Sequence, residues 1–273
     1  MSDIISNILQ YPFIIRALIV GIFVSFCAAL LGVSLVLKRY SMIGDGLSHV
    51  GFSALSIAVA MNWAPVVISI PVIILTAVLL LHFSEKNKIS GDAAIALIST
   101  SSLALGVIAV SITSGINVDV FNYMFGSILA INQSDLTLSI VISTIVLILF
   151  IISYNKIFAI TFDENFAHAI GINVKFYKML LAILTGIMIV VGMKIMGALL
   201  MSSLIIFPTL SSTRICKQFK SVAINSAIIS IVSFIIGLVF SYFFSTPTGA
   251  TIVVVDLLIF IFYSLVGILK QRI

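Results

Sequence analysis

Nine long apolar stretches divide the sequence, and each is close to the length that a helix needs to cross a membrane. A spanning helix takes about 20 apolar residues, because it must cross a hydrocarbon core about 30 Å thick. Only 8% of the residues are charged, whereas soluble domains carry about 25%. We therefore expect an all-α, polytopic transmembrane helical bundle of about nine spans (range eight to ten), forming one domain over residues 1–273. The predicted spans are 14–37, 42–61, 64–82, 93–113, 135–154, 175–192, 195–213, 221–243 and 250–269.

The basic residues predict the orientation of these spans. With nine crossings, 12 of the 14 Lys and Arg residues fall on one side, and only Arg16 and Lys194 fall on the other. Basic loops remain in the cytoplasm, so we expect a cytoplasmic C-terminus and an external N-terminus. Residues 120–132 are too short to span, and counting them as a crossing would place Lys156 on the wrong side. We expect them to form a short helix or re-entrant segment at the outer face.

The sequence also disfavours several classes of protein. A formal net charge of +5 is too dilute to indicate nucleic-acid binding, and Cys27 and Cys216 lie at different predicted depths, so no disulfide is expected. No Gly-Lys dipeptide is present, so the chain has no P-loop, and it has no H-E-x-x-H motif. ATP hydrolysis would therefore belong to another subunit, and we expect no permanently bound cofactor.

Asp45 and His49 are the strongest candidates for chemistry. Their spacing of four residues places both side chains on one face of a helix, inside an apolar segment where ionisable groups are costly. A carboxylate and an imidazole that converge form part of a site for a divalent transition metal. Serines at positions 41, 48, 53 and 56 continue the same polar face, so it could line a pathway. Alternatively, these serines join helices by hydrogen bonds, which is common in membrane proteins.

One chain supplies only two such ligands, whereas zinc prefers four in a tetrahedron. A two-fold dimer with this helix at its axis would bring two Asp and two His side chains together. The sequence therefore suggests a homodimer as well as a metal site.

A second candidate region lies in the predicted cytoplasmic loop at residues 161–171. Asp163 and Glu164 supply negative charge at a helix N-terminus, and Gly171 is a suitable C-terminal stop. A helix of about two turns would then present Phe162 and Phe166 to a partner. It could equally be a capped surface helix with no partner, and His168 is expected to be an ordinary surface histidine.

The stretch Gly197 to Pro208 combines small residues, which permit close helix packing, with a proline that should kink the helix. Lys194 and Asp256 are further charges in or near apolar segments and are not predicted to be ligands. Three rival functions remain on these residues: an ion-coupled secondary metal transporter, an intramembrane metalloenzyme, and a scaffolding subunit. The first would use inverted repeats, which the sequence does not show, and the second would need more ligands in each chain.

The segment Lys38-Arg39-Tyr40-Ser41-Met42-Ile43-Gly44-Asp45-Gly46-Leu47-Ser48-His49 resembles the signature of the zinc/manganese permease family of ABC importers. The resemblance continues through Gly91-Asp92-Ala93-Ala94, Phe125-Gly126-Ser127-Ile128-Leu129, the Asp163-Glu164 loop, the Gly197 to Pro208 stretch and Thr246-Pro247-Thr248-Gly249. Around His49 the sequence looks more like zinc-type members, because manganese-type members often carry a Pro-Gly pair just after the histidine. Zinc is therefore the first expected substrate and manganese the second.

This resemblance implies a homodimeric permease of the cobalamin-importer type in the plasma membrane of a bacterium. It implies two cytoplasmic ATP-binding subunits and an extracytoplasmic metal-binding protein as partners, besides membrane lipid. Asp45 and His49 match the family's pathway ligands. By the same analogy, residues 161–171 form the coupling helix, whose contact residues would be Phe162, Asp163, Glu164, Phe166, Ala167 and Gly171. The expected mechanism is alternating access driven by the ATPase partner.

Overall fold

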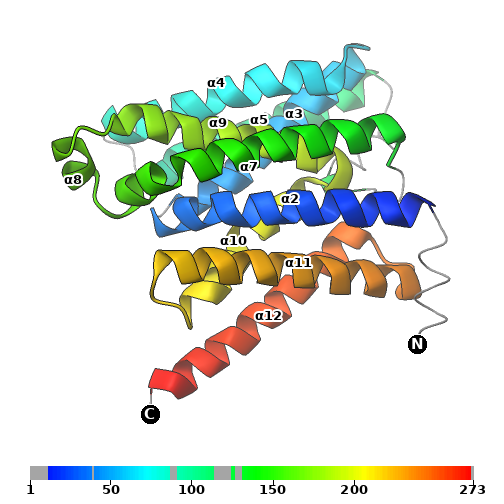
Figure 1. Cartoon of the computed structure of the whole chain (residues 1–273). Coiled ribbons are helices and arrows are strands. Elements are labelled where there is room, and N and C mark those ends of the chain that lie inside the picture. The colour runs from blue at the N-terminus through cyan, green and yellow to red at the C-terminus, as the bar shows by residue number, and fades with distance from the viewer. Residues whose placement is uncertain (1–11, 39, 87–90, 114–123, 127–130, 272–273) are drawn as a thin grey trace.

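A computed structural model describes residues 12–38, 40–86, 91–113, 124–126 and 131–271. The described part of the chain is built from helices and contains no strand (Figure 1). The longer helices are α2 (Pro12–Leu37), α3 (Ser41–Ala60), α4 (Pro65–Lys86), α5 (Gly91–Thr113), α7 (Gln133–Phe162), α9 (Val174–Met196), α10 (Ala198–Thr213), α11 (Phe219–Phe244) and α12 (Thr248–Gln271). A short helix, α8 (Glu164–Ala169), projects from the bundle between α7 and α9.

The expectation of nine membrane spans is wrong. Among the described residues, seven helices are long and apolar enough to cross a membrane. The apolar stretches Pro65–Leu80 of α4 and Ala198–Thr213 of α10 are shorter. A 16-residue helix such as α10 is about 24 Å long, less than the hydrocarbon thickness of about 30 Å. The sequence argument treated every apolar run as a crossing, whereas a turn at Gly197 limits the length of α10.

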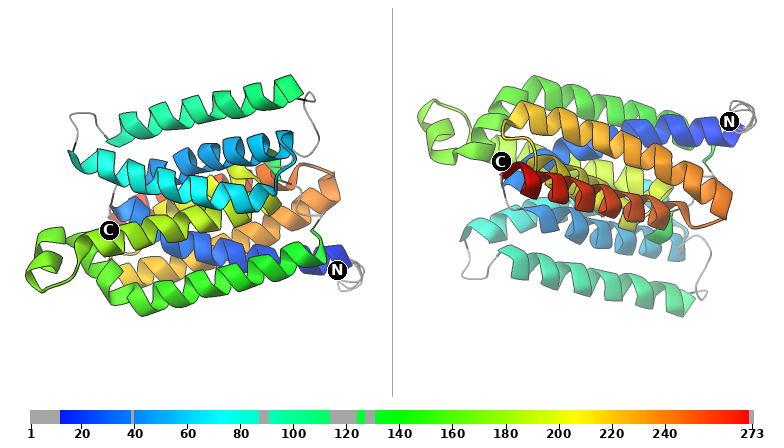
Figure 2. Two further views of the ribbon diagram at one scale, coloured as in Figure 1. Left: turned by 90° about the horizontal axis from the view of Figure 1, so that it is seen from above. Right: turned by 90° about the horizontal axis from the view of Figure 1, so that it is seen from below.

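The helices form a bundle with interior and peripheral members. The apolar windows of α3 and α9 are 72% buried, whereas those of α5 and α12 are only 22% and 17% buried. Figure 2 shows α5 at one outer edge of the bundle and α7 at the opposite edge. Helices α5 and α12 therefore leave most of their apolar surface available to lipid or to another subunit.

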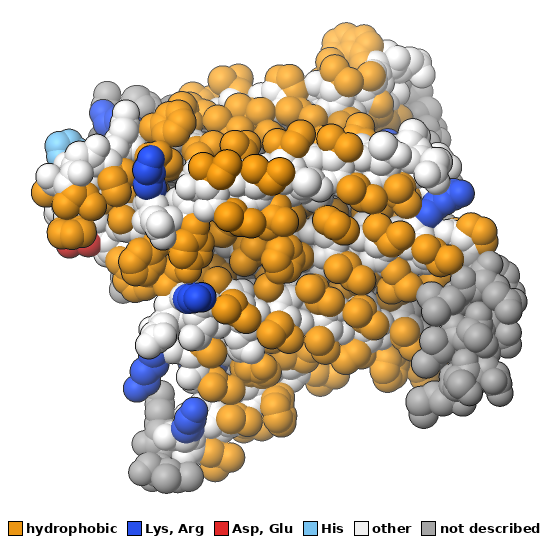
Figure 3. All heavy atoms as spheres, viewed as in Figure 1, with side chains coloured by type: hydrophobic (Ala, Val, Ile, Leu, Met, Phe, Trp, Pro, Cys, Tyr) orange, Lys and Arg blue, Asp and Glu red, His pale blue; other side chains and the backbone are white. Residues whose placement is uncertain are grey.

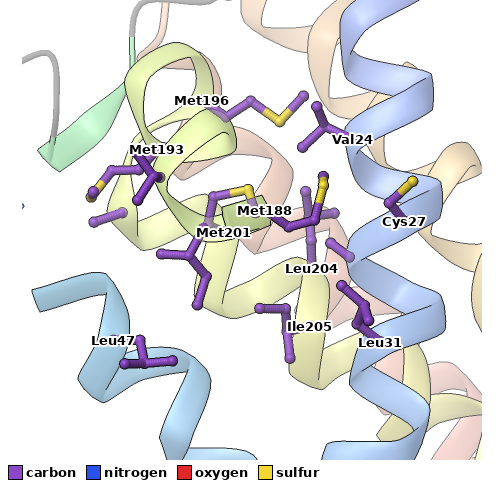
Figure 4. Close-up of a cluster of buried hydrophobic side chains, with 14 of the residues drawn as sticks. Val24, Cys27, Leu31, Leu47, Met188, Met193, Met196, Met201, Leu204 and Ile205 are labelled. Carbon is purple, nitrogen blue, oxygen red and sulfur yellow. The ribbon is translucent and has the colours of Figure 1, made fainter. Parts of the chain in front are cut away.

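The largest core cluster takes side chains from all nine of the longer described helices, α10 among them. Figure 4 shows side chains from α2, α3, α9 and α10 meeting around Met201, Leu204 and Ile205. Gly32 of α2 allows this packing, because a Cβ at that position would lie 2.1 Å from the carbonyl oxygen of Ile205. Several methionines fill the remaining space, which suits their flexible side chains.

Gly197 separates α9 from α10. Its φ of +86° and ψ of 156° are accessible almost only to glycine. A Cβ there would lie 2.4 Å from the backbone nitrogen of Gly126, so two chain segments touch through their backbones. Most of the predicted outer-face segment 120–132 lies outside the described residues, but its Gly126 forms this contact. Pro208 lies inside α10, and the helix continues on both sides of it.

Candidate functional site

Asp45 and His49 lie next to each other on α3, one helical turn apart. The distance between Asp45 Oδ2 and His49 Nε2 is 3.7 Å, so the groups are close but do not form a hydrogen bond. Their side chains are 38% and 27% exposed, respectively. A carboxyl oxygen and an imidazole nitrogen therefore face the same partly open surface.

Glycines on α3 allow neighbouring helices to approach closely around this pair. A Cβ on Gly44 would contact Ile205 of α10, and one on Gly46 would contact Ile95 of α5. Gly51 faces α4 and α9 in the same way. Helices thus enclose α3 on several sides, and the Asp45–His49 side remains partly open between α10 and α5.

The serines of the same helix lie in different environments. Ser48 is only 1% exposed, and its hydroxyl donates to the carbonyl oxygen of Gly44 at 2.8 Å. Ser53 is buried beside Gly106 of α5, whereas Ser41 is half-buried. In this conformation Ser48 and Ser53 do not face an open space, and their role in lining a pathway stays a prediction.

No group of three or more His, Cys, Asp or Glu side chains that could hold a metal ion occurs in the described part of the chain. Asp45 and His49 thus offer two protein ligands, fewer than the four of a closed tetrahedral zinc site or the three of a catalytic one. Such a pair suits brief contact with a passing cation, or a site shared between two subunits.

The loop predicted to dock a partner forms α8 (Glu164–Ala169). Asp163 caps it, because its Oδ1 accepts a hydrogen bond from the backbone N–H of Phe166 at 2.9 Å. Ala167 is fully buried beneath the helix, and Gly171 ends the turn with a φ of +83°. Local sequence therefore determines both ends of α8, although it is shorter than the predicted segment.

Glu164 attaches α8 to two other helices. Its carboxylate contacts Lys38 Nζ, just after α2, at 2.7 Å and Lys178 Nζ of α9 at 2.6 Å. Burial would raise the pKa of Glu164, but hydrogen bonds and charge from Lys178 and Lys38 bring the pKa below its usual value. The carboxylate is therefore charged at neutral pH and connects α8 to the ends of α2 and α9.

The region of α8 presents two exposed aromatic side chains and, apart from them, a hollow. Phe162 and Phe166 are 60% and 58% exposed. A cavity of about 650 Å³ lies beside the helix, between Glu164, His168 and the beginning of α9. An exposed aromatic pair is the kind of surface that docks into a groove of a partner protein.

Two charged side chains that were not predicted to be ligands have defined partners. Lys194, at the end of α9, contacts Asp135 Oδ1 at the beginning of α7 at 2.5 Å. Asp256 of α12 is fully buried, and its Oδ2 accepts a hydrogen bond from Ser203 of α10 at 2.9 Å. A charged residue inside an apolar segment indicates that it has a polar or charged partner, but the sequence does not identify that partner.

Comparison with known proteins identifies the family. The model of the ABC 3 transport family matches residues 10–267. The chain belongs to this family. This confirms the resemblance to the zinc/manganese permease family of ABC importers.

Several relatives match over almost their whole length. The high-affinity zinc uptake system membrane protein ZnuB of Haemophilus influenzae is 30% identical over 92% of this chain and 97% of its own. The manganese transport system membrane protein MntC of Listeria monocytogenes is 28% identical over 94% of this chain and 91% of its own. The structure of PsaBC from Streptococcus pneumoniae, in complex with Fab, has a TM-score of 0.86 at 26% identity and covers 96% of this chain and 94% of its own.

Proposed function

We propose that this chain is the membrane permease subunit of an ATP-driven importer that moves a divalent transition metal into the cytoplasm, with zinc as the first candidate and manganese as the second. The observation that carries the proposal is the Asp45–His49 pair, which lies partly open on a helix of an ABC-family membrane protein. Relatives named for zinc uptake and for manganese transport support the class of substrate.

Two copies of the chain would complete the metal site. Each copy contributes one carboxylate and one imidazole from α3, so a two-fold axis beside this face would bring four ligands together. The ion must bind and then leave, so a temporary, partly hydrated site serves transport better than a closed one. Ser41, Ser48 and Ser53 would line the route when the helices around α3 move.

Helix α8 is the proposed contact with the ATP-binding subunits. Phe162 at the end of α7 and Phe166 of α8 supply the exposed apolar surface of this contact. Asp163 caps α8, Ala167 is buried beneath it, and Gly171 ends the turn that follows. Through Glu164, a displacement of α8 would pull on the ends of α2 and α9. ATP binding in the partner would then change the packing of the bundle, giving alternating access. Pro208 would help α10 to bend during this change.

We further propose that the bundle forms one permease domain in the plasma membrane of a bacterium. The end that carries α8 is rich in basic residues, including Lys38, Lys175 and Lys178, and Figure 3 shows Lys and Arg side chains gathered near it. Basic ends remain cytoplasmic, so this end and the C-terminus would face the cytoplasm. An extracytoplasmic metal-binding protein would then deliver the ion at the opposite end.

Metal uptake by vesicles that contain the permease, its ATP-binding subunits and its metal-binding protein tests this function. His49→Ala and Asp45→Asn should each reduce zinc uptake at least tenfold while assembly with the ATPase is retained, because one ligand is lost from each chain. Met42→Leu changes an exposed side chain close to the same face without removing a metal ligand of this kind and should preserve uptake. Normal uptake by the His49→Ala variant would contradict the proposal. Stronger competition by manganese than by unlabelled zinc would reverse the order of substrates.

A further inference from the structure

An apolar groove of about 470 Å³ crosses the outside of the bundle. Residues of α2, α7 and α11 line it, and Figure 1 shows α2 running between α7 and α11. Small side chains on α11 leave space between these helices. The residues that define the groove include Phe26, Leu30, Phe150, Tyr154, Ala223 and Ala227.

The groove lies on a surface that is suited to lipid. Its rim contains Ile151, Ile224 and Ile228, which are 60%, 53% and 54% exposed. Figure 3 shows that the surrounding face is mostly hydrophobic, with Lys and Arg side chains near its ends. In a membrane-spanning family, such a face contacts the hydrocarbon core, so a hollow in it is accessible to acyl chains.

One end of the groove is positively charged. Among the described residues that line it, Lys220 is the only charged one, and this exposed side chain lies in the first turn of α11. The N-cap residue Gln218 makes no side-chain hydrogen bond to the helix, so the positive end of α11 lies beside the lysine. Lys217 adds a further positive charge one residue before this cap. These groups attract an anion at the level where α11 enters the membrane.

The dimensions of the groove match one half of a bilayer. From Lys220 to Ile231, the groove follows α11 over 12 residues, which is 11 steps or about 16 Å at about 1.5 Å per residue. Half of the hydrocarbon core is about 15 Å. A ligand with an anionic group at Lys220 and a hydrocarbon chain along the groove would therefore extend through one leaflet.

We propose that this groove is a binding site for an anionic phospholipid, with the phosphate at Lys220 and one acyl chain between α7 and α11. The acyl chain buries apolar surface along the helices, and the lysine selects the charge of the headgroup. In the orientation proposed above, the lipid belongs to the inner leaflet.

The lipid would also support the region next to α8. Phe219, at the beginning of α11, lies 5.1 Å from Phe158 and 6.0 Å from Phe162, measured between ring centroids. These two aromatic side chains belong to the last turns of α7, which leads into α8. An occupied groove would hold α7 and α11 together near this aromatic contact.

Native mass spectrometry of the purified full-length chain tests the site. The probes are phosphatidylglycerol, phosphatidylcholine with the same two acyl chains, and inorganic phosphate. Phosphatidylglycerol should bind at least about fivefold more tightly than phosphatidylcholine, since a lysine near a membrane surface contributes about that preference for an anionic lipid. Inorganic phosphate should not compete, because it cannot occupy the apolar groove.

Four variants separate this site from general attraction to membranes. Lys220→Gln should remove the preference for phosphatidylglycerol, and its control Lys270→Gln, at the end of α12, should retain it. Ile224→Ala should weaken the binding of both lipids about threefold, because it removes part of the apolar rim of the groove. Ile235 is also partly exposed on α11 but lies outside the groove, so the control variant Ile235→Ala should leave the binding of both lipids unchanged.

The proposal would be overturned if Lys220→Gln and Lys270→Gln lowered the preference for phosphatidylglycerol equally. Competition by inorganic phosphate for the lipid site would also overturn it. Melting temperatures measured without added lipid show whether each variant folds. Metal uptake is not part of this test, so the lipid site and the proposed transport function can fail independently.

Discussion

Gly197 provides a quantitative test of the packing at the turn between α9 and α10. Replacement by Ala forces an L-residue into a φ of +86°, at a cost of about 1–3 kcal/mol. The new Cβ would also lie 2.4 Å from the nitrogen of Gly126, 2.6 Å from the carbonyl carbon of Phe125 and 2.9 Å from the oxygen of Met124. All three are backbone atoms, which cannot rotate away, so overpacking adds about 1–3 kcal/mol. We expect Gly197→Ala to destabilise the protein by about 2–6 kcal/mol in total.

Gly171→Ala is the matched control. This glycine also has a positive φ, +83°, but a Cβ there would have no atom within 4 Å. It should therefore show only the conformational cost, about 1–2 kcal/mol. Thermal unfolding of both variants in the same detergent measures the difference, and Gly197→Ala should melt several degrees lower, since 1 kcal/mol shifts Tm by roughly 2–4 °C in a chain of this size. Equal melting temperatures would refute the close backbone contact at Gly197.

Two further predictions concern charged groups. Because its folded-state pKa is lowered, Glu164 stabilises the protein at pH values above its unfolded pKa, and this contribution is lost as pH falls through the lowered value. The melting temperatures of the wild type and Glu164→Gln should therefore converge in acid, and a constant difference down to pH about 2 would contradict this. Ser203→Ala should destabilise by about 1–3 kcal/mol, because the buried Asp256 carboxyl loses a hydrogen bond. Ser202→Ala is its control in thermal unfolding, because the Ser202 hydroxyl donates to the carbonyl oxygen of Leu199 in its own helix. Equal losses of stability in the two variants would contradict a specific role for Ser203.

Local patterns in the sequence predicted several parts of the site. The spacing of Asp45 and His49 placed their side chains together, because a helix repeats every 3.6 residues. Asp163 was predicted at a helix N-terminus, and it caps α8. The family resemblance, read from such short motifs, is also confirmed. Each of these features depends on residues within a few positions of one another, so the sequence contains the necessary information.

The number of spans was mispredicted for a physical reason. Composition alone does not distinguish a helix that crosses the bilayer from a shorter apolar helix enclosed by protein, since both are hydrophobic. Helix α10 is of the second kind, and its length depends on the turn at Gly197. That turn is in contact with Gly126, which is remote in the sequence.

The sequence by itself determined the membrane character of the chain, the helical spacing that pairs a carboxylate with an imidazole, and the capped end of α8. Only the tertiary structure decided which helices are interior, which lysines bind Glu164, where Asp256 finds its partner, and that α2, α7 and α11 leave a groove. Local features follow from backbone geometry and side-chain type over a few residues. The others depend on contacts between distant segments, and many sequences with the same apolar pattern could pack in different ways.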